Sequence, residues 1–295
     1  MDSLRSVLTR LEAEGVGLGH FNVSDLVCVK AVVAAAAQLG VPVLVGASEG
    51  ERDFFGVRQL AVVVNSLREE FDVPIFLNAD HTHSLAKAVE AAKAGFDEII
   101  VDFSALPFEQ NVLSTKEALE AVKATNPAIL VEGEIGDIGT GSEIHEKAQN
   151  EFKKLTTAEE ARQFVESTGI DVLAPAVGNM HGMVESMVEG KTKKRLDIER
   201  IAQIKKATRV FLTLHGGSGT NDDDFRRAIA AGISIIHVST ELRVAWRESL
   251  EGSLAAQPKE VVPYKILSPV VASVAKVVGS RLRLFSEERK TRSAA

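Results

Sequence analysis

The sequence is poor in cysteine, in long apolar runs and in excess positive charge, and each shortage excludes a class of protein. Its 295 residues include one cysteine, Cys28, so the chain holds neither a disulfide framework nor a cysteine-rich zinc module, and it suits a reducing cytosol. No uninterrupted apolar run reaches the ~18 residues that a membrane span needs. Residues 1–15 have the pattern of an amphipathic helix and lack the apolar centre of a signal peptide. We therefore expect a soluble, cytoplasmic protein with no membrane partner.

The charge balance argues against nucleic acid as a partner. The chain has 34 Lys and Arg residues against 41 Asp and Glu residues, a formal net charge of −7. Such a chain has no general positive field to neutralise a phosphate backbone. Hydrophobic residues make up 45% of the chain and charged residues 25%, which is the mix of a globular protein that can bury a large core.

Short runs of consecutive Val, Ile and Leu alternate with longer segments of helical period. Each run predicts a strand buried on both faces, and hence a parallel sheet covered by helices. The predicted strands are 16–22, 42–47, 74–79, 98–102, 128–134, 172–175, 210–215 and 234–238. The predicted helices between them are 26–38, 56–70, 84–94, 111–125, 158–167, 197–207, 222–231 and 241–254. Eight such pairs in about 250 residues indicate an α/β fold, a closed (β/α)8 TIM barrel.

An open doubly wound sheet is the alternative architecture, but it needs a glycine-rich phosphate turn after its first strand. Residues 17–25, GLGHFNVSD, do not form the GxGxxG pattern. Two further helices are expected outside the repeat, an N-terminal one at 3–14 and a C-terminal extension near 269–284. The glycine-rich and polar segment 136–154 predicts a mobile loop, and 182–195 a second irregular stretch. We expect one barrel domain, residues 1–286, and a frayed charged tail at 287–295.

Histidines and carboxylates stand where the predicted strands end, and in a (β/α)8 barrel these ends form one mouth. Three imidazoles from three strands are a natural ligand set for a catalytic Zn²⁺ ion, and His81, His181 and His215 are the best candidates. Asp80 precedes the first of them and could act as a tuned acid or base, or could hold a ligand imidazole. Other carboxylates at strand ends, Asp102 and Glu134 among them, could reach the metal or support a ligand.

Two turns near the end of the predicted barrel indicate a binding site for an anion. The sequence HGGSG at 215–219 precedes a helix, and its successive backbone N–H groups with the helix N-terminus would form a cradle. The end of the eighth strand, 238–240, would form the other half, at the place where barrels commonly hold phosphate. For either turn alone, the alternative is a plain loop with Ser218 or Asn221 as the helix N-cap.

Together these motifs resemble those of the class II ketose-bisphosphate aldolases, in order and over nearly the whole chain. The shorter tagatose/fructose-bisphosphate branch is closest in length. The motifs are FNV at 21–23, NADH at 78–81, VDFS at 101–104, VEGEIG at 131–136, GNMHG at 178–182, LHGGSG at 214–219 and HVSTELR at 237–243.

The resemblance implies a metal-dependent, reversible aldol cleavage of a ketose bisphosphate to dihydroxyacetone phosphate and an aldehyde. It would make His81, His181 and His215 the ligands of one Zn²⁺ ion, although other divalent ions are alternatives. Asp80 would move the proton of the C4 oxygen. Glu143 would exchange the C3 proton of dihydroxyacetone phosphate.

The resemblance also assigns Glu134 and Asp102 to an alternative buried metal site or to the surroundings of the metal. Asn22 and Ser48 would contact substrate oxygens. The dihydroxyacetone phosphate end would lie against Gly182, Gly216, Gly217, Ser218, His237, Val238, Ser239 and Thr240. Family members assemble as dimers or tetramers, so a homodimer or homotetramer is expected.

The chain differs from the family pattern at the residues that are expected to bind phosphate. The family usually has a tyrosine–lysine pair after the second zinc histidine, with the lysine on phosphate, whereas this chain has Glu185 near that place. The usual asparagine and acid of the last motif are His237 and Ser239 here. These changes concern substrate identity more than reaction type. Two other hypotheses are a zinc barrel hydrolase, whose expected HxH pair is missing from residues 19–22, and a non-catalytic binding or scaffold barrel.

Overall fold

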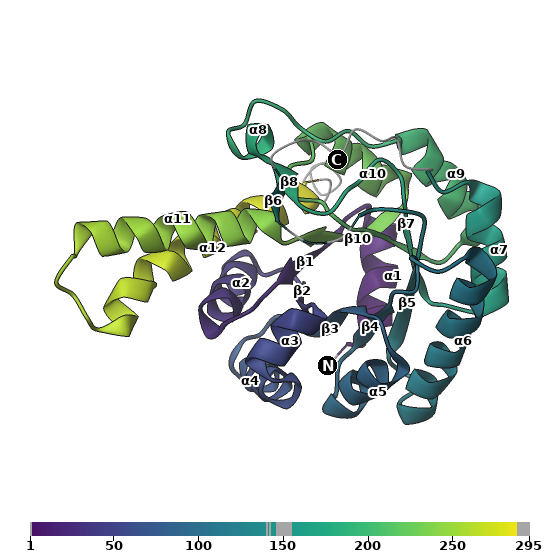
Figure 1. The fold of residues 1–295 in the computed structure, drawn as a ribbon, viewed down its shortest axis with the longest axis horizontal. Helices are drawn as coiled ribbons and strands as arrows, with labels where there is room; N and C mark the ends of the chain where they lie inside the picture. Colours follow the sequence, from purple (N-terminus) through teal and green to yellow (C-terminus); the bar gives the residue numbers. More distant parts are fainter. Residues whose placement is uncertain (1, 140, 142, 146–154, 288–295) are drawn as a thin grey trace.

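Eight parallel strands close into one barrel in the computed structural model, which describes residues 2–139, 141, 143–145 and 155–287. The strand order around the barrel is β1-β10-β9-β7-β5-β4-β3-β2 (Figure 1). The predicted (β/α)8 barrel is therefore confirmed. The barrel strands are β1 (Leu18–Asn22), β2 (Val43–Ala47), β3 (Ile75–Thr82), β4 (Glu98–Val101), β5 (Leu130–Ile135), β7 (Val172–Pro175), β9 (Phe211–Leu214) and β10 (Ile233–Val238).

A helix follows each barrel strand, and local sequence signals set where these helices begin. Side chains of Asp25, Ser84, Thr157 and Asn221 accept hydrogen bonds from the first turns that they precede. The helices of the repeat are α2 (Leu26–Leu39), α4 (Val57–Glu70), α5 (Leu85–Ala94), α6 (Phe108–Thr125), α7 (Ala158–Thr168), α9 (Ile198–Thr208), α10 (Asp222–Ala231) and α11 (Thr240–Ala256).

The structure also contains elements that the sequence patterns did not predict. Helix α3 (Glu49–Phe55) is short and charged, and it has no apolar stripe to reveal it. The predicted loops contain strands β6 (Ile144–His145) and β8 (Met183–Val184), which pair with each other, and helix α8 (Glu185–Val188). Residues 140, 142 and 146–154 of the predicted mobile loop lie outside the described residues, as do 288–295 of the predicted tail.

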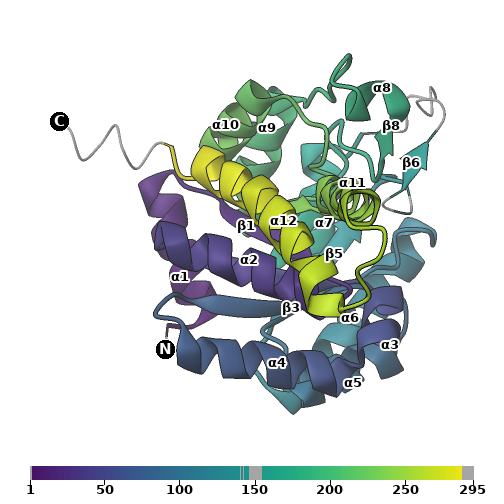
Figure 2. The same ribbon diagram turned by 90° about the vertical axis from the view of Figure 1, so that its left-hand side faces the viewer.

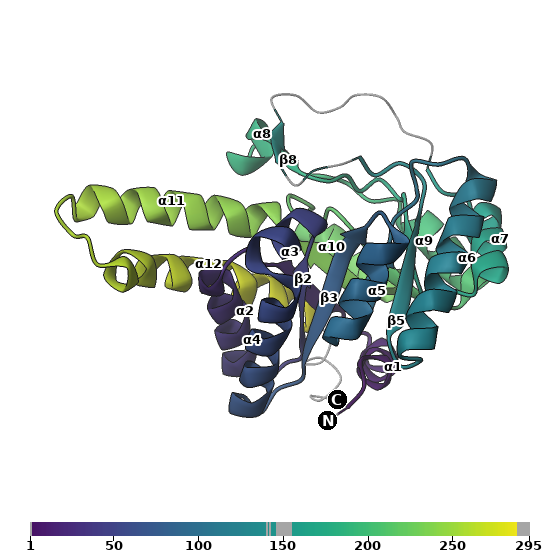
Figure 3. The ribbon, with the colours of Figure 1, turned by 60° about the horizontal axis from the view of Figure 1, so that its bottom comes forward.

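The C-terminal extension is longer than predicted. Helix α12 (Pro263–Phe285) begins with a proline in its first turn and continues through Pro269. It packs along α2 and forms a hairpin with α11 (Figure 2). The hairpin projects from the side of the barrel (Figure 3). Val261, in the connection between its two helices, and Tyr264, in the first turn of α12, are exposed. No helix among the described residues is long and apolar enough to span a membrane.

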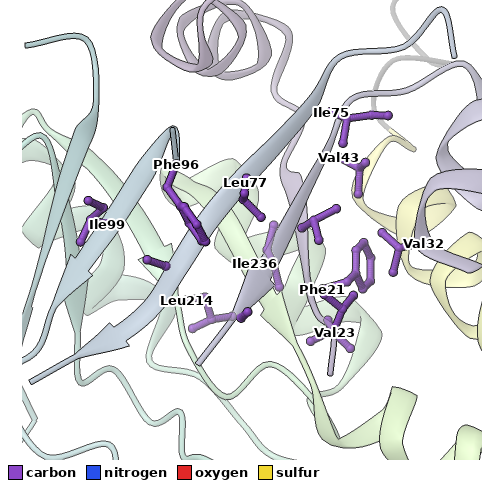
Figure 4. Close-up of a cluster of buried hydrophobic side chains, with 14 of the residues drawn as sticks. Phe21, Val23, Val32, Val43, Ile75, Leu77, Phe96, Ile99, Leu214 and Ile236 are labelled. Carbon is purple, nitrogen blue, oxygen red and sulfur yellow. The ribbon is translucent and has the colours of Figure 1, made fainter. Parts of the chain in front are cut away.

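Two apolar layers stabilise the barrel. The larger lies between the strands and the surrounding helices and includes Phe21, Val32 and Leu77 (Figure 4). The smaller fills the bottom of the barrel, where helix α1 (Leu4–Glu14) packs its buried face against inward-facing side chains such as Leu18 and Phe76. Figure 3 shows α1 at the opposite end of the barrel from β8 and α8.

Above the smaller apolar layer the barrel interior is polar. Side chains point to the same face at every second residue of a strand, so residues two and four positions beyond Leu18 or Phe76 also face inward. These positions on β1 and β3, and corresponding positions on β4, β5 and β9, hold polar groups that are fully buried: His20, Asn78, Glu98, Glu132 and Thr213. The sequence thus places a polar column inside the barrel that leads to its mouth.

Because α1 seals the bottom, Leu8→Ala should destabilise the protein without touching the mouth. The lost contacts and the resulting cavity should lower the free energy of unfolding by about 2–5 kcal/mol. Chemical denaturation of Leu8→Ala beside Leu113→Ala, which removes an exposed side chain, measures the difference. Equal midpoints for the two variants would show that α1 does not contribute to the core.

Candidate active site

Four buried ligand atoms meet at the barrel mouth. His81 at the end of β3, His181 after β7, His215 after β9 and Glu134 of β5 each offer one atom, and these atoms lie within 4.8 Å of one another. Nε2 of His81, Nε2 of His181, Nδ1 of His215 and Oε2 of Glu134 are buried and lack a well-aligned hydrogen bond. Buried polar atoms without partners are costly, so this set fits a divalent metal ion.

Carboxylates hold the second nitrogen of two of these imidazoles. Nδ1 of His81 donates to Oδ2 of Asp102 at 2.9 Å, and Nε2 of His215 donates to Oε1 of Glu132 at 2.6 Å. Such bonds set the tautomer and orient the ring, which leaves the other nitrogen for a metal. Asp102 therefore lies behind His81, whereas Glu134 belongs to the four-atom group itself. Glu132, one of the strand-end carboxylates, supports His215.

The carboxylates also control protonation. Burial alone would lower the pKa of His81, but Asp80 and Asp102 outweigh it and raise this pKa to about 9. Burial is likewise outweighed at His215, where Glu132 raises the pKa well above its ordinary value. Burial, followed by repulsion from the two other imidazoles, lowers the pKa of His181 well below its ordinary value. A metal ion must therefore displace protons to bind.

His81 has a strained backbone that a buried arginine supports. Its φ of 93° lies in the left-handed region, and the pairing of β3 with β4 shifts register between Ala79 and Thr82. The guanidinium of Arg52, on α3, donates to the carbonyl of Asp80 at 2.8 Å and to Oγ1 of Thr82 at 3.0 Å. The sequence analysis did not identify Arg52, because its carbonyl partners belong to β2 and β3 and carry no sequence signal.

Asp80 presents one free oxygen to the mouth. Its Oδ2 accepts a hydrogen bond from Asn22 Nδ2 at 2.7 Å, while Oδ1 has no hydrogen-bond partner and lies 3.6 Å from Nε2 of His81. Burial alone would raise the pKa of Asp80, but His81 and His237 outweigh it and hold this pKa well below its usual range. Asp80 is therefore an ionised carboxylate with an oxygen available to a ligand.

A small pocket joins this carboxylate to the predicted anion cradle. Its lining residues are Asn22, Asp80, His181, Gly182, Gly216, Ser218, His237, Ser239 and Thr240. The structure thus brings together residues predicted from five strand ends. Gly216 has a φ of 59°, and a Cβ there would lie 2.1 Å from the carbonyl oxygen of Met180, so no larger residue fits.

The cradle is organised by hydrogen bonds between its two turns. Oγ of Ser218 accepts hydrogen bonds from the N–H groups of Ser239 at 3.2 Å and Glu241 at 3.3 Å, and Gly217 N donates to the carbonyl of His237 at 2.9 Å. Asn221 is the N-cap of α10, so Ser218 does not have that alternative role. The ring of His237 stacks on His20 with centroids 3.4 Å apart, and His20 was assigned no role from the sequence.

Of the predicted substrate-binding and proton-transfer residues, Ser48, Glu143, Gly217 and Val238 are not among the residues that line the pocket. The side chain of Val238 is fully buried in the apolar core, because alternate residues of β10 face outward. The hydroxyl of Ser48 donates to Glu51 at 3.0 Å, and Glu51 also binds Asn22 and Arg243. Glu143 is exposed, and its carbonyl accepts the N–H of Met183. Glu51 was missed because an acidic residue in a charged turn normally faces solvent.

Removal of the arginine should loosen the metal site. Arg52→Met leaves the carbonyl of Asp80 and the hydroxyl of Thr82 without their donor, so the backbone of His81 loses its support. We expect zinc affinity to fall by about 10-fold to 100-fold, measured by competition with a chromophoric chelator. Arg58→Met, which changes an exposed arginine of α4, is the matched control. Unchanged affinity in Arg52→Met would contradict the role of Arg52.

Metal affinity should rise with pH. Because the pKa of His81 is about 9 without metal, zinc must displace its proton at neutral pH. Each unit of pH decrease below that pKa should therefore weaken zinc binding by about tenfold for every proton displaced. Calorimetry in two buffers of different ionisation enthalpy counts those protons. A zinc affinity that stays constant between about pH 6 and pH 8 would contradict this protonation.

Comparisons with known proteins agree with this geometry. The family model described as "Fructose-bisphosphate aldolase class-II" matches residues 2–290. The chain is 34% identical over 300 residues to a fructose-bisphosphate aldolase of Thermus caldophilus, covering 95% of this chain and 96% of that protein. It is 30% identical over 289 residues to a sulfofructosephosphate aldolase of Alkalicoccus urumqiensis, covering 98% of each. The crystal structure of the YdjI aldolase from Escherichia coli K12 matches with a TM-score of 0.80 at 26% identity, over 96% of both chains.

These matches favour the aldolase hypothesis over the hydrolase and the scaffold barrel. The chain belongs to the class II fructose-bisphosphate aldolase family, a family of metal-dependent lyases that act on phosphorylated sugars.

Proposed function

We propose that this protein catalyses the zinc-dependent, reversible aldol cleavage of a ketose phosphate, such as fructose 1,6-bisphosphate, to dihydroxyacetone phosphate and an aldehyde. The observation that carries the proposal is the group of three imidazoles and one carboxylate with free ligand atoms. It lies beside a free oxygen of Asp80 and opens to a glycine-lined pocket. The names of the relatives support a ketose phosphate as substrate.

His81, His181 and His215 would hold the ion, with Glu134 able to bind it in an alternative, buried position and Asp102 behind His81. Three imidazole ligands suit Zn²⁺ and leave a coordination position open to substrate, while Co²⁺ and Fe²⁺ are alternatives. The bound ion would supply a Lewis acid that stabilises the negative charge developed when the carbon–carbon bond breaks.

Asp80 would act as the base for cleavage. Its free oxygen takes the proton of the C4 hydroxyl, the C4 oxygen forms the carbonyl of the aldehyde, and the C3–C4 bond breaks. The electron pair of that bond passes toward the C2 carbonyl of the dihydroxyacetone half. A proton then returns to C3, and Glu143 would deliver it. The backbone of Glu143 lies beside Gly182: a Cβ added to that glycine would lie 2.5 Å from the carbonyl oxygen of Glu143.

The pocket would hold the dihydroxyacetone phosphate half. Asn22 and Ser48 would contact substrate oxygens, and Asn22 also fixes the carboxylate of Asp80. Val238 would take part through its main chain only, because its side chain is in the core. The phosphate half would lie against Gly182, Gly216, Gly217, Ser218, His237, Val238, Ser239 and Thr240.

The protein would work in the cytoplasm as a homodimer or homotetramer. The projecting hairpin of α11 and α12 supports self-association, because Val261 and Tyr264 of this hairpin expose apolar surface. Light scattering on the purified chain tests the assembly. The barrel domain would span residues 1–286.

A substrate panel on zinc-loaded protein tests the function. Fructose 1,6-bisphosphate, tagatose 1,6-bisphosphate and their 1-phosphates are incubated with the protein, and triose phosphate is detected through a coupled dehydrogenase. We expect triose phosphate release that a chelator abolishes, and no lysine adduct trapped by borohydride. Stoichiometric zinc without triose phosphate from any ketose phosphate would overturn the proposal.

Two substitutions should separate metal binding from proton transfer. His81→Ala should lose zinc and activity while the barrel stays folded, because its ring lies at the mouth and outside the apolar core. Asp80→Ala should retain zinc and lose turnover by about 10²-fold to 10⁴-fold, the usual contribution of a general base. Metal analysis, circular dichroism and kcat are the measurements. A near-normal kcat in Asp80→Ala would remove that carboxylate from its role.

A further inference from the structure

Lys194 is a buried lysine in a segment of exposed basic residues. Its side chain is 4% exposed, whereas Lys193 and Arg195 on either side of it are exposed. Its Nζ donates to three backbone carbonyls, those of Met180 at 2.7 Å, Gly182 at 2.6 Å and Gly216 at 2.9 Å. Among the described residues, no carboxylate forms an ion pair with it. Burying a charge that no direct ion pair balances is costly, and a ligand of opposite charge in the pocket would reduce that cost.

The three carbonyls belong to the two loops that carry zinc-ligand candidates. Met180 and Gly182 flank His181, and Gly216 follows His215. Gly182 and Gly216 also line the pocket. The ammonium group therefore sits directly behind the pocket wall and bridges its two sides. The main chain of Lys194 strengthens this placement, because its N–H donates to the carbonyl of Gly219 at 2.9 Å.

The pocket otherwise offers no cation. Its lining contains glycines, hydroxyls, imidazoles and carboxamide or carboxylate groups, but neither lysine nor arginine. A phosphate there would meet backbone N–H groups and hydroxyls, while Asp80 contributes negative charge. Lys194 contacts the two lining glycines, Gly182 and Gly216, from behind, so it is placed to supply positive charge on that side of the pocket.

We propose that Lys194 is a positioning residue that acts as a built-in monovalent cation: it joins the loops of His181 and His215 and supplies the positive charge of the phosphate subsite. This proposal rests on the proposed function, because it takes the ligand to be a sugar phosphate. Several carbonyl oxygens converging on one centre are the arrangement with which proteins hold K⁺. The lysine side chain occupies that centre permanently, so no free ion is required.

Lys194 titrates near neutral pH, so its ammonium form is only partly populated there without a bound anion. Burial lowers the pKa of Lys194 to about 7, and Glu241 opposes the shift. Three carbonyl acceptors require three N–H donors, and only the ammonium form has three. A phosphate dianion in the pocket would favour the same form.

Lys194→Met tests the proposal, because it keeps much of the side-chain length and removes the charge. Binding of inorganic phosphate to zinc-loaded protein should weaken by about 10-fold to 100-fold, as expected for the loss of charge-assisted contacts. With substrate, KM should rise more than kcat falls. Lys193→Met is the matched control and should bind phosphate like the unmodified protein.

A rescue experiment distinguishes a cation site from simple loop packing. In Lys194→Ala, which empties the space beside the carbonyl cluster, about 0.1 M ammonium or potassium chloride should restore phosphate binding, whereas tetramethylammonium chloride at equal ionic strength should not, because it is too large for the cluster. Phosphate binding within twofold of the control, or equal restoration by all three salts, would overturn the proposal.

The unmodified protein supplies a test that does not depend on the variant folding. Its phosphate affinity should be equal in potassium and in tetramethylammonium buffers, because Lys194 fills the cation position. Strong dependence on potassium would overturn the proposal. Phosphate binding is measured apart from turnover, so a failure to cleave every ketose phosphate would count against the proposed function and leave this result standing.

Discussion

The site depends on mutual pairing of carboxylates and imidazoles inside the barrel. Burying a titratable group this deeply without a partner would cost too much free energy, so these groups form hydrogen bonds with one another. Glu132 accepts hydrogen bonds from His215 and Thr213, and Asn78 donates to Glu98 while its oxygen lies 3.1 Å from Nε2 of His20. Burial, followed by the nearby charge of Glu132, raises the pKa of Glu98 well above its ordinary value.

This network determines which atoms of the histidines point into the barrel mouth. Each supporting carboxylate lies below or beside an imidazole and occupies one of its nitrogens, so the other nitrogen faces the common centre. Glu132 does this for His215, and Asp102 does it for His81. The same logic leaves Asp80 with one oxygen bound to Asn22 and one free. The arrangement therefore separates the four candidate metal-ligand atoms from the free oxygen of Asp80, although all of them lie within a few ångströms.

The predicted anion cradle uses backbone more than side chains. Ser218 and the two glycines before it draw the ends of β9 and β10 together, and the ring of His237 stacks on His20. Glu51 adds a buried carboxylate beside Asn22 and binds Arg243.

Much of the fold and half of the site were predictable from local patterns. Consecutive apolar residues identified all eight strands, and the polar residues that end them, such as Asp80, His181 and His215, were predicted to meet because barrel strands share one mouth. Other residues had no local signal. Arg52 lies in the short charged helix α3, which has no apolar pattern, and its carbonyl partners belong to two different strands.

The sequence by itself determined the alternation of strands and helices and the chemical character of the mouth, because both follow from residue type and periodicity. Tertiary structure alone decided which nitrogen of each histidine is free, why the backbone at His81 is left-handed and where the ammonium of Lys194 lies. These features depend on closure of the barrel, which brings together atoms far apart along the chain. The partners of Arg52 and Lys194 are mainly backbone carbonyls, which every residue carries, so no pattern of side chains records them.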